Sequence, residues 1–275
     1  MAQLSWHELV LPAGNEDLIF EFFHENSKIG RHTPNPPLED VRKHLELLQP
    51  SLSYEGYPRL NLPQPIDHSA ISLFRTMRSR VSVRTFTPST VSIETLATLL
   101  HYSYGVTRTS EETGLPRGFR MVPSGGGLYP LELYLHTAQL EGHESGLYHY
   151  NPEQTCLRHI RSGDATQEIS KALIQPDIGR KASLLIFITA LFERSTFKYQ
   201  DRGYRFALIE AGHVAQNLNL VANALGYESV NIGGFFDREI DTHLGIDGVT
   251  HSTIYMIAIG KRPTGTDGDT VPSEI

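Results

Sequence analysis

The stretch Y-R-F-A-L-I-E-A-G-H-V-A-Q-N-L-N-L-V-A-N-A-L-G, residues 204–226, decides the fold because it predicts a long helix that is apolar on two sides. An apolar stripe with spacings of three and four residues is formed by Leu208, Ala211, Ala215, Leu218, Ala222 and Leu225. We expect Gly212, Val214 and Val221 on the opposite side, and Gly226 at the helix end. One side would pack on a sheet, and a symmetric partner helix is a candidate for the other. The alternative is a buried helix in a monomer.

Helical and strand patterns alternate around this helix from about residue 69. Helices are expected over 71–77, 92–104 and 165–174, the last of them on the surface. Strands are expected over 131–138, 146–151, 157–160, 183–190 and 252–260. The continuous apolar run S-L-L-I-F-I-T-A at 183–190 is typical of a central strand that is buried on both faces.

The N-terminal third has a different composition. Eight of the sixteen prolines fall at or before Pro65, between two short helical patterns and an extended segment over 51–65. We therefore expect three parts: an N-terminal proline-rich helical extension over 1–68, a main domain over 69–263 and a flexible tail over 264–275. Two readings of the extension stay open, one as a substrate-facing arm and the other as a packing arm.

Composition and charge limit the possible function. The chain has 275 residues and a net charge of −7, from 24 basic and 31 acidic residues, which argues against nucleic-acid binding. Apolar runs are too short to span a membrane, and we expect a cytoplasmic location without a secretory signal. The single cysteine, Cys156, excludes an internal disulfide and reads as a small buried hydrophobe. His143, His149, Cys156 and His159 fit no standard zinc spacing, so no metal is expected.

The segment R-V-S-V-R, residues 80–84, is the first candidate for ligand binding. In an extended chain Arg80, Ser82 and Arg84 point the same way, and two guanidinium groups with a hydroxyl suit a phosphate. The alternative is an exposed polar strand. Lys261 and Arg262, in G-K-R-P at 260–263, could add charge to the same pocket, and a polar strand end is the alternative.

Two glycine segments could bring backbone amides close to a ligand. They are P-S-G-G-G-L-Y-P over 123–130 and I-G-G-F-F-D over 232–237. The first segment has neither the spacing of a Walker loop nor that of a dinucleotide fingerprint. For the first, a plain flexible turn is the alternative.

The stretch F-K-Y-Q-D-R-G-Y-R-F, residues 197–206, is either a charged helix start or a catalytic segment. Lys198 and Tyr199 are adjacent, so both can face one site only on a turn or at a helix start. Arg202 and Arg205 would act as supports, and we expect Asp201 to pair with one of them.

Together these segments resemble the nitroreductase superfamily of FMN flavoproteins over roughly residues 69–263. The resemblance implies an FMN site that is formed by Arg80, Val81, Ser82, Arg84, Pro123, Ser124, Gly125, Gly126, Gly233, Gly234, Lys261 and Arg262. Val81 departs from the pattern, since many relatives carry a second arginine there; a backbone contact would remain, but one charge is lost. The implied fold is α+β, with a mixed, mainly antiparallel sheet flanked by helices. Two subunits would interlock as a homodimer around a long central interface helix, with FMN at the interface.

One branch of the superfamily is more similar still, the azoline dehydrogenases of the streptolysin S-type and microcin-type peptide pathways. G-G-G-L-Y-P and K-Y-Q-D-R-G-Y-R carry this resemblance. It implies that Lys198 and Tyr199 are catalytic, one as the base and the other as its orienting partner. Neither side chain is a good base at neutral pH when free in water, whereas neighbouring charge and burial would let the two tune each other.

The expected function is therefore FMN-dependent oxidation of thiazolines or oxazolines to azoles in a ribosomally made peptide. A cyclodehydratase complex would be the partner, and oxygen would reoxidise the flavin. Two alternatives stay open: an NAD(P)H-dependent oxidoreductase of the same fold that acts on another small molecule, and a noncatalytic FMN-holding scaffold.

Overall fold

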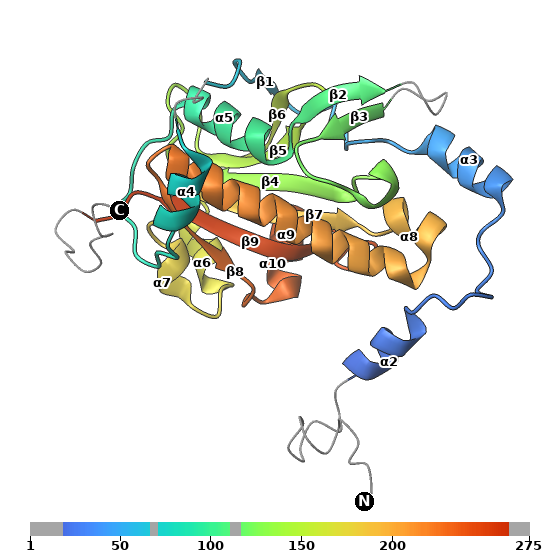
Figure 1. Cartoon of the computed structure of the whole chain (residues 1–275). Coiled ribbons are helices and arrows are strands. Elements are labelled where there is room, and N and C mark those ends of the chain that lie inside the picture. The colour runs from blue at the N-terminus through green and yellow to red at the C-terminus, as the bar shows by residue number, and fades with distance from the viewer. Residues whose placement is uncertain (1–18, 67–70, 111–116, 264–275) are drawn as a thin grey trace, which may run out of the picture.

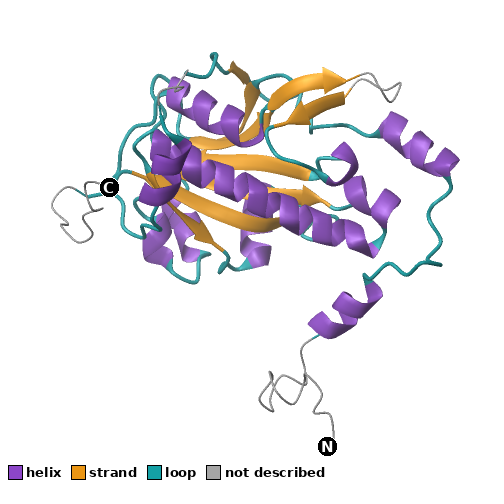
Figure 2. Ribbon diagram, viewed as in Figure 1, coloured by secondary structure: helices purple, strands orange, loops and turns teal. Residues whose placement is uncertain are grey.

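The computed structural model describes residues 19–66, 71–110 and 117–263, in which a large sheet lies between two layers of helices (Figure 1, Figure 2). The strands are β1 (Arg59–Asn61), β2 (Val106–Ser110), β3 (Arg117–Arg120), β4 (Leu131–Thr137), β5 (Gly146–Asn151), β6 (Cys156–Ser162), β7 (Leu184–Leu191), β8 (Glu228–Ile232) and β9 (His251–Gly260). The helices are α2 (Phe20–Asn26), α3 (Leu38–Leu47), α4 (Leu73–Ser79), α5 (Ile93–Tyr104), α6 (Thr166–Lys171), α7 (Pro176–Gly179), α8 (Glu193–Tyr199), α9 (Asp201–Ala224) and α10 (Asp237–Leu244), with a 3-10 turn η1 (Gly125–Gly127).

The seven strands of the main sheet follow the order β1-β6-β5-β4-β7-β9-β8, and β2 pairs with β3 separately. Every pairing between these strands is antiparallel. Parallel contacts among the described residues are confined to single bridges, such as Ser82 with Ser229. The α+β class with an antiparallel sheet is thus confirmed, and the sheet is more uniformly antiparallel than expected.

The central strand β7 explains the long apolar run at 183–190. Ile186 and Ile188 belong to the core under α5 and α9, whereas Leu185 and Phe187 pack with residues of α6, α7 and α10 on the other face. Because both faces are covered, alternating polar positions would leave unpaired polar groups in the interior. The predicted central strand is confirmed.

Helix α9 is as long as expected. Its buried face is rotated by about one residue relative to the stripe predicted from the sequence. Ala211, Ala215, Leu218 and Ala222 are buried as predicted. Leu208 is 41% exposed, and Val214, which we expected on the opposite side, is fully buried. The stripe that packs on the sheet therefore runs through Ala207 and Val214. A heptad count beginning at Leu208 misses it, because a straight helix has 3.6 residues per turn.

The N-terminal segment adds β1 to the edge of the sheet, where it pairs with β6, and its residues 51–54 also contact Glu132 and Tyr134 of β4. Before it, α2 and α3 project from the body of the molecule (Figure 1). None of the residues of α2 is buried. The expected tail over 264–275 lies outside the described residues, and the boundary near residue 68 stays a prediction. No helix in the described ranges has the length and apolar character needed to cross a membrane.

Candidate active site

Lys198 and Tyr199 lie in the last turn of α8, and both are half-buried. The next residue, Gln200, has φ 50° and separates α8 from α9. The pair thus ends a short helix, where we had expected a turn or a helix start. Lys198 Nζ is 5.2 Å from the centre of the Tyr199 ring. In the described part of the chain, neither Lys198 Nζ nor Tyr199 Oη has a hydrogen-bond partner.

Gly203 explains why a glycine follows the pair so closely. A Cβ at this position would lie 2.8 Å from the backbone of Ser195 and Thr196, so only glycine lets the first turn of α9 approach α8 this closely. Asp201 forms no ion pair with Arg202 or Arg205 among the described residues, contrary to expectation. Arg205 instead donates to Ser27 Oγ, at 2.8 Å, in the N-terminal segment.

The glycine loop over 123–127 packs directly against the pair. Gly126 has φ 66°, and a Cβ there would overlap Tyr199 Oη and lie 3.1 Å from Lys198 Nζ. A Cβ at Gly125 would lie 2.8 Å from the Phe206 ring, which itself makes an edge contact with Tyr199. Two segments some seventy residues apart are therefore brought together, and the glycines allow the close approach.

A buried polar network behind this loop was not identified from the sequence. Glu210 of α9 accepts a hydrogen bond from Tyr104 Oη at 2.8 Å, and burial raises the pKa of Glu210 to about 7. Arg120 stacks on the rings of Tyr104 and Tyr129, at 4.4 and 5.0 Å. The available signal was a single carboxylate in the otherwise apolar run F-A-L-I-E-A-G.

The arginine segment lies at the other end of α9. Ser79 Oγ donates to Asn223 Oδ1 at 2.7 Å, and Val83 N donates to the Ser229 carbonyl at 3.1 Å. Arg80 donates to Ser82 Oγ at 3.4 Å, so these two side chains share a side as predicted. Ser82 and Arg84 are exposed, and Val81 is half-buried.

Lys261 and Arg262 gather at the same place, because Thr87 N donates to the Lys261 carbonyl at 2.8 Å. Arg262 pairs with Glu228 at 3.1 Å. Lys261 Nζ donates to the Gly226 carbonyl at 2.7 Å, and burial lowers the pKa of Lys261. Arg80 and Arg84 have no carboxylate partner among the described residues. Arg80, Ser82, Arg84, Lys261 and Arg262 thus form one group, the arginine cluster. This cluster keeps positive charge that an anion could neutralise.

Gly233 and Gly234 follow β8, and Gly233 comes four residues after Ser229, which Val83 contacts, or about 13 Å along the strand. A Cβ at Gly233 would meet only the Tyr255 ring, at 3.9 Å, an ordinary contact. At Gly234 a Cβ would approach Ile174 to 3.2 Å. Packing within this chain does not require glycine at 233, and both glycines are exposed, so their backbone is accessible to another molecule.

The predicted residues thus form two groups in one chain. The Lys198–Tyr199 pair and the glycine loop lie at the N-terminal end of α9, and the arginine cluster lies at its C-terminal end. A helix of 24 residues is about 36 Å long. One FMN molecule cannot contact both groups of the same chain.

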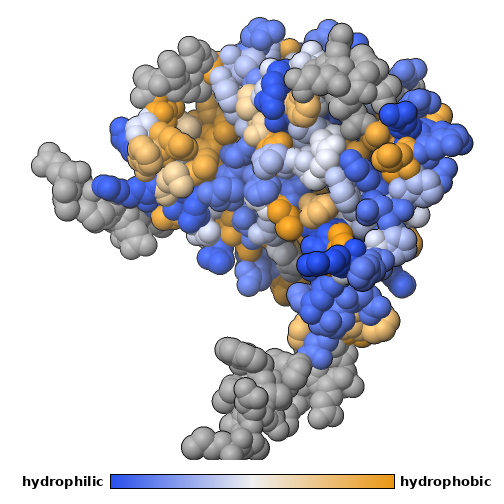
Figure 3. Space-filling view, turned by 45° about the vertical axis from the view of Figure 1, so that its right-hand side comes forward, coloured by the Kyte–Doolittle hydropathy of each residue, from blue (hydrophilic) through white to orange (hydrophobic). Residues whose placement is uncertain are grey.

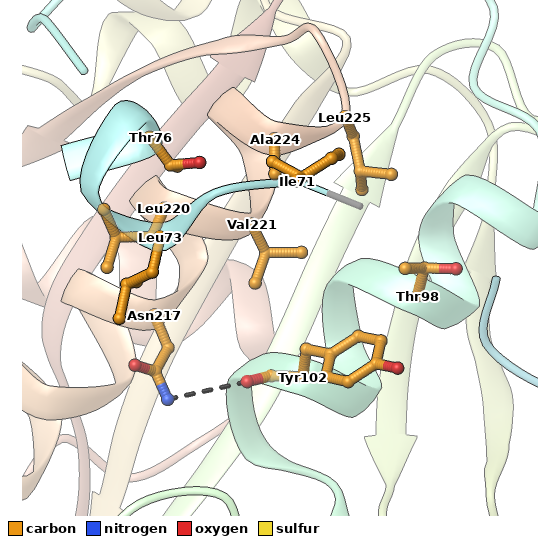
Figure 4. A pocket seen from close by; sticks show the side chains of 10 residues that line it. All are labelled: Ile71, Leu73, Thr76, Thr98, Tyr102, Asn217, Leu220, Val221, Ala224 and Leu225. Carbon is orange, nitrogen blue, oxygen red and sulfur yellow. Dashed lines mark hydrogen bonds between the residues drawn. The ribbon is translucent and has the colours of Figure 1, made fainter. Parts of the chain in front are cut away.

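An uncovered apolar surface lies along the C-terminal third of α9, near the arginine cluster. A pocket of about 510 Å³ separates α4, α5 and α9, and Figure 4 shows its lining. Asn217 Nδ2 donates to the Tyr102 carbonyl at 3.5 Å across one side, while Leu220 and Val221 line the floor. Beyond the pocket, Ile209 is 56% exposed and Phe74 81% exposed. Figure 3 shows such hydrophobic side chains in patches on this surface and on the N-terminal arm.

Two further expectations concern Cys156 and metal binding. Cys156 is buried and has no disulfide partner, as predicted, and burial raises its pKa. Within the described ranges, no group of three or more His, Cys, Asp or Glu residues is placed to hold a metal ion.

The profile described as "Nitroreductase family" matches residues 77–261. "Putative nitroreductase MJ1384" of Methanocaldococcus jannaschii is 37% identical over 196 residues, which cover 71% of this chain and 94% of that protein. The microcin B17-processing protein McbC of Escherichia coli is 32% identical over 163 residues, 57% of each protein, so only about half of its length is matched. The trifolitoxin-processing protein TfxB of Rhizobium leguminosarum bv. trifolii is 31% identical over 86% of this chain and 67% of its own.

Solved structures have the same fold. A chain of the E. coli microcin synthetase McbBCD complex with truncated pro-MccB17 bound superposes with a TM-score of 0.57 and 27% identity, over 95% of this chain and 99% of that chain. A nitroreductase-type structure from Anabaena variabilis reaches a TM-score of 0.72 at 24% identity, over 89% of this chain and 47% of the other, and shows the fold alone.

Proposed function

The chain belongs to the nitroreductase family, and we propose that it is an FMN-dependent dehydrogenase that oxidises azoline rings to azoles in a ribosomally made peptide. The observation that carries this proposal is the packing of Lys198 and Tyr199 against Gly126. Removal of a proton from a ring carbon requires a base, and this pair supplies two candidate groups. The relatives McbC and TfxB, named for processing microcin B17 and trifolitoxin, support the peptide substrate.

The Lys198–Tyr199 pair would accept the proton that this reaction releases. Oxidation of a thiazoline or oxazoline removes a hydride from one ring carbon and a proton from the adjacent carbon, and a base must accept the proton. Lys198 and Tyr199 are half-buried and free of hydrogen bonds to the described residues, so both remain available to a substrate. We propose one as the base and the other as its orienting partner.

The residues around the arginine cluster fit FMN. Arg80, Ser82, Arg84, Lys261, Arg262 and the backbone of Val81 would hold the phosphate, and Gly233 and Gly234 would lie beside the ring system. The positive charge of Arg80 and Arg84, which no described carboxylate neutralises, and the exposed backbone at Gly233 support this assignment. When bound, FMN supplies the acceptor for the hydride.

A homodimer would complete the site. Because the two groups of residues lie at opposite ends of α9, we propose that Pro123, Ser124, Gly125 and Gly126 of one copy, with its Lys198–Tyr199 pair, meet the arginine cluster of another. The apolar pocket between α4, α5 and α9 and the exposed side chains of α9 give a second copy a surface to cover.

The partners follow from the same proposal. The substrate would be a peptide in which a cyclodehydratase has already formed azoline rings, and oxygen would be the final electron acceptor. The related chain in the McbBCD complex is found together with a pro-peptide, which supports assembly with such an enzyme.

A second candidate is an NAD(P)H-dependent oxidoreductase that acts on another small molecule. The 37% identity to a protein named only as a nitroreductase, over nearly its whole length, favours this reading.

Anaerobic mixing separates the two candidates. Bleaching of the flavin absorbance by a thiazoline-containing peptide, with loss of two hydrogens from the peptide, supports the azoline dehydrogenase. Rapid bleaching by NADPH alone, with none by the peptide, supports the second candidate. A preparation that cannot be loaded with FMN would contradict both.

A further inference from the structure

Glu132 is a buried carboxylate near the start of β4 that the proposed reaction does not use. Its side chain is 1% exposed. Burial alone would raise the pKa of Glu132, but Arg194 and His149 outweigh burial and hold it well below the usual range. A buried charge with this many partners ties together the elements that supply them.

Four groups from three parts of the chain converge on this carboxylate. Arg194 of α8 forms an ion pair with it at 2.7 Å, and His149 Nε2 of β5 lies at 2.6 Å. From the N-terminal segment, Leu52 N donates at 2.9 Å and Ser51 Oγ at 3.2 Å. Residues 51–52 and helix α8 are thus held by the same two oxygen atoms.

Arg194 lies one helical turn before Lys198, so its position fixes that of the pair. The N-terminal segment also contacts residues on both sides of the pair. His44 stacks on Phe197 with ring centres 5.2 Å apart, and Gln200 Nε2 donates to the Pro34 carbonyl at 3.4 Å. The same segment is linked to the glycine loop through Arg120 and Tyr129. Arg120 donates to the Pro50 carbonyl and its backbone N donates to Tyr129 Oη, while Tyr129 N donates to Ser124 Oγ of the loop at 2.9 Å.

We propose that residues 50–54 form a strap that fixes α8 through Glu132, and that Glu132 is a positioning residue for the Lys198–Tyr199 pair. This inference rests on the proposed function for its kinetic consequence, but its structural consequence does not depend on it. The N-terminal extension would then contribute to the active site by positioning this pair.

Three variants separate positioning from stability. Glu132→Gln alone leaves Arg194 buried without a counter-charge, so we expect a lower melting temperature and lower activity together. Glu132→Gln/Arg194→Met replaces the buried ion pair with a neutral pair of similar volume, and we expect most of the melting temperature to return. Glu193→Gln removes an exposed carboxylate from the same helix and serves as the matched control.

The expected result for the double variant is a kcat lower by about 10- to 100-fold with KM within about 2-fold, because α8 is present but misplaced. FMN retention stays unchanged, since the arginine cluster lies at the far end of α9. Recovery of kcat together with the melting temperature would overturn the proposal, because Glu132 would then be structural only.

Hydrogen exchange tests the strap without the reaction. In the FMN-loaded double variant we expect faster amide exchange over 51–54 and 193–199 than in the wild type, with the sheet unchanged. Unchanged exchange in both segments would overturn the strap. If the wild-type protein does not oxidise an azoline peptide, the proposed function is wrong. The hydrogen-exchange result then tests the strap by itself.

Discussion

Replacing Gly126 by alanine should lower turnover much more than the loss of stability alone would explain. Gly126 has φ 66°, a conformation that costs an alanine about 1–2 kcal/mol. The new Cβ would also overlap Tyr199 Oη, whereas ordinary contact begins at 3.4 Å. The hydroxyl must therefore move by about 1 Å, and a displacement of this size in a catalytic group can lower the rate by about 100-fold, or about 2.7 kcal/mol.

Gly142→Ala is the matched control. Gly142 has φ 70° and nothing within 4 Å of its Cβ position, so this variant carries the same backbone cost without touching the pair. Both variants should lose similar stability in chemical denaturation, and only Gly126→Ala should lose turnover of a thiazoline peptide under FMN saturation. Turnover of Gly126→Ala within about 3-fold of Gly142→Ala would refute the inferred role of this contact.

Three further predictions test the remaining parts. The native state holds the proton of Glu210 up to about pH 7, whereas the unfolded chain releases it near pH 4.5, so the free energy of unfolding should decrease as the pH rises from 4.5 to 7. Glu210→Gln should remove this loss, which is worth about 3 kcal/mol. A parallel pH dependence of both proteins in denaturation would contradict the assignment. Arg80→Ala/Arg84→Ala should weaken FMN binding by about 10- to 100-fold in a fluorescence titration. The control is Arg180→Ala, which removes an exposed arginine paired with Asp177 and should leave FMN binding unchanged. Equal effects of the two changes would argue against the phosphate site. Co-expression of Lys198→Ala with Arg80→Ala/Arg84→Ala should restore about a quarter of wild-type activity, since half of the dimers would hold one intact site; no recovery in mixed dimers would contradict a site shared between copies.

Much of the fold was predictable because burial leaves a clear pattern. The run at 183–190 lacks polar positions since β7 is covered on both faces, and Ser92 and Gly105 bracket α5 as capping residues do. The phase of α9 was not predictable, because Ala207 and Leu208 are both apolar and differ only in what the sheet covers.

The site was predictable only where the segment itself carries a chemical signal. Arg80 and Arg84 alternate in sequence, and the glycines of 125–126 have no side chain to obstruct a neighbour. Glu132 and Glu210 were missed because a single carboxylate in an apolar segment looks the same in sequence whether it is buried or exposed. Their partners, such as Arg194 and Tyr104, are brought to them only by the tertiary fold.

The most direct test of the proposed function is the mass of a thiazoline-containing peptide after incubation with FMN-loaded protein and oxygen. The proposal predicts a loss of two hydrogens with the wild type and with the control variants Tyr204→Phe and Lys171→Ala. It predicts no loss with Lys198→Ala or Tyr199→Phe at equal FMN content. An unchanged peptide with the wild type, or full conversion by both pair variants, would contradict it.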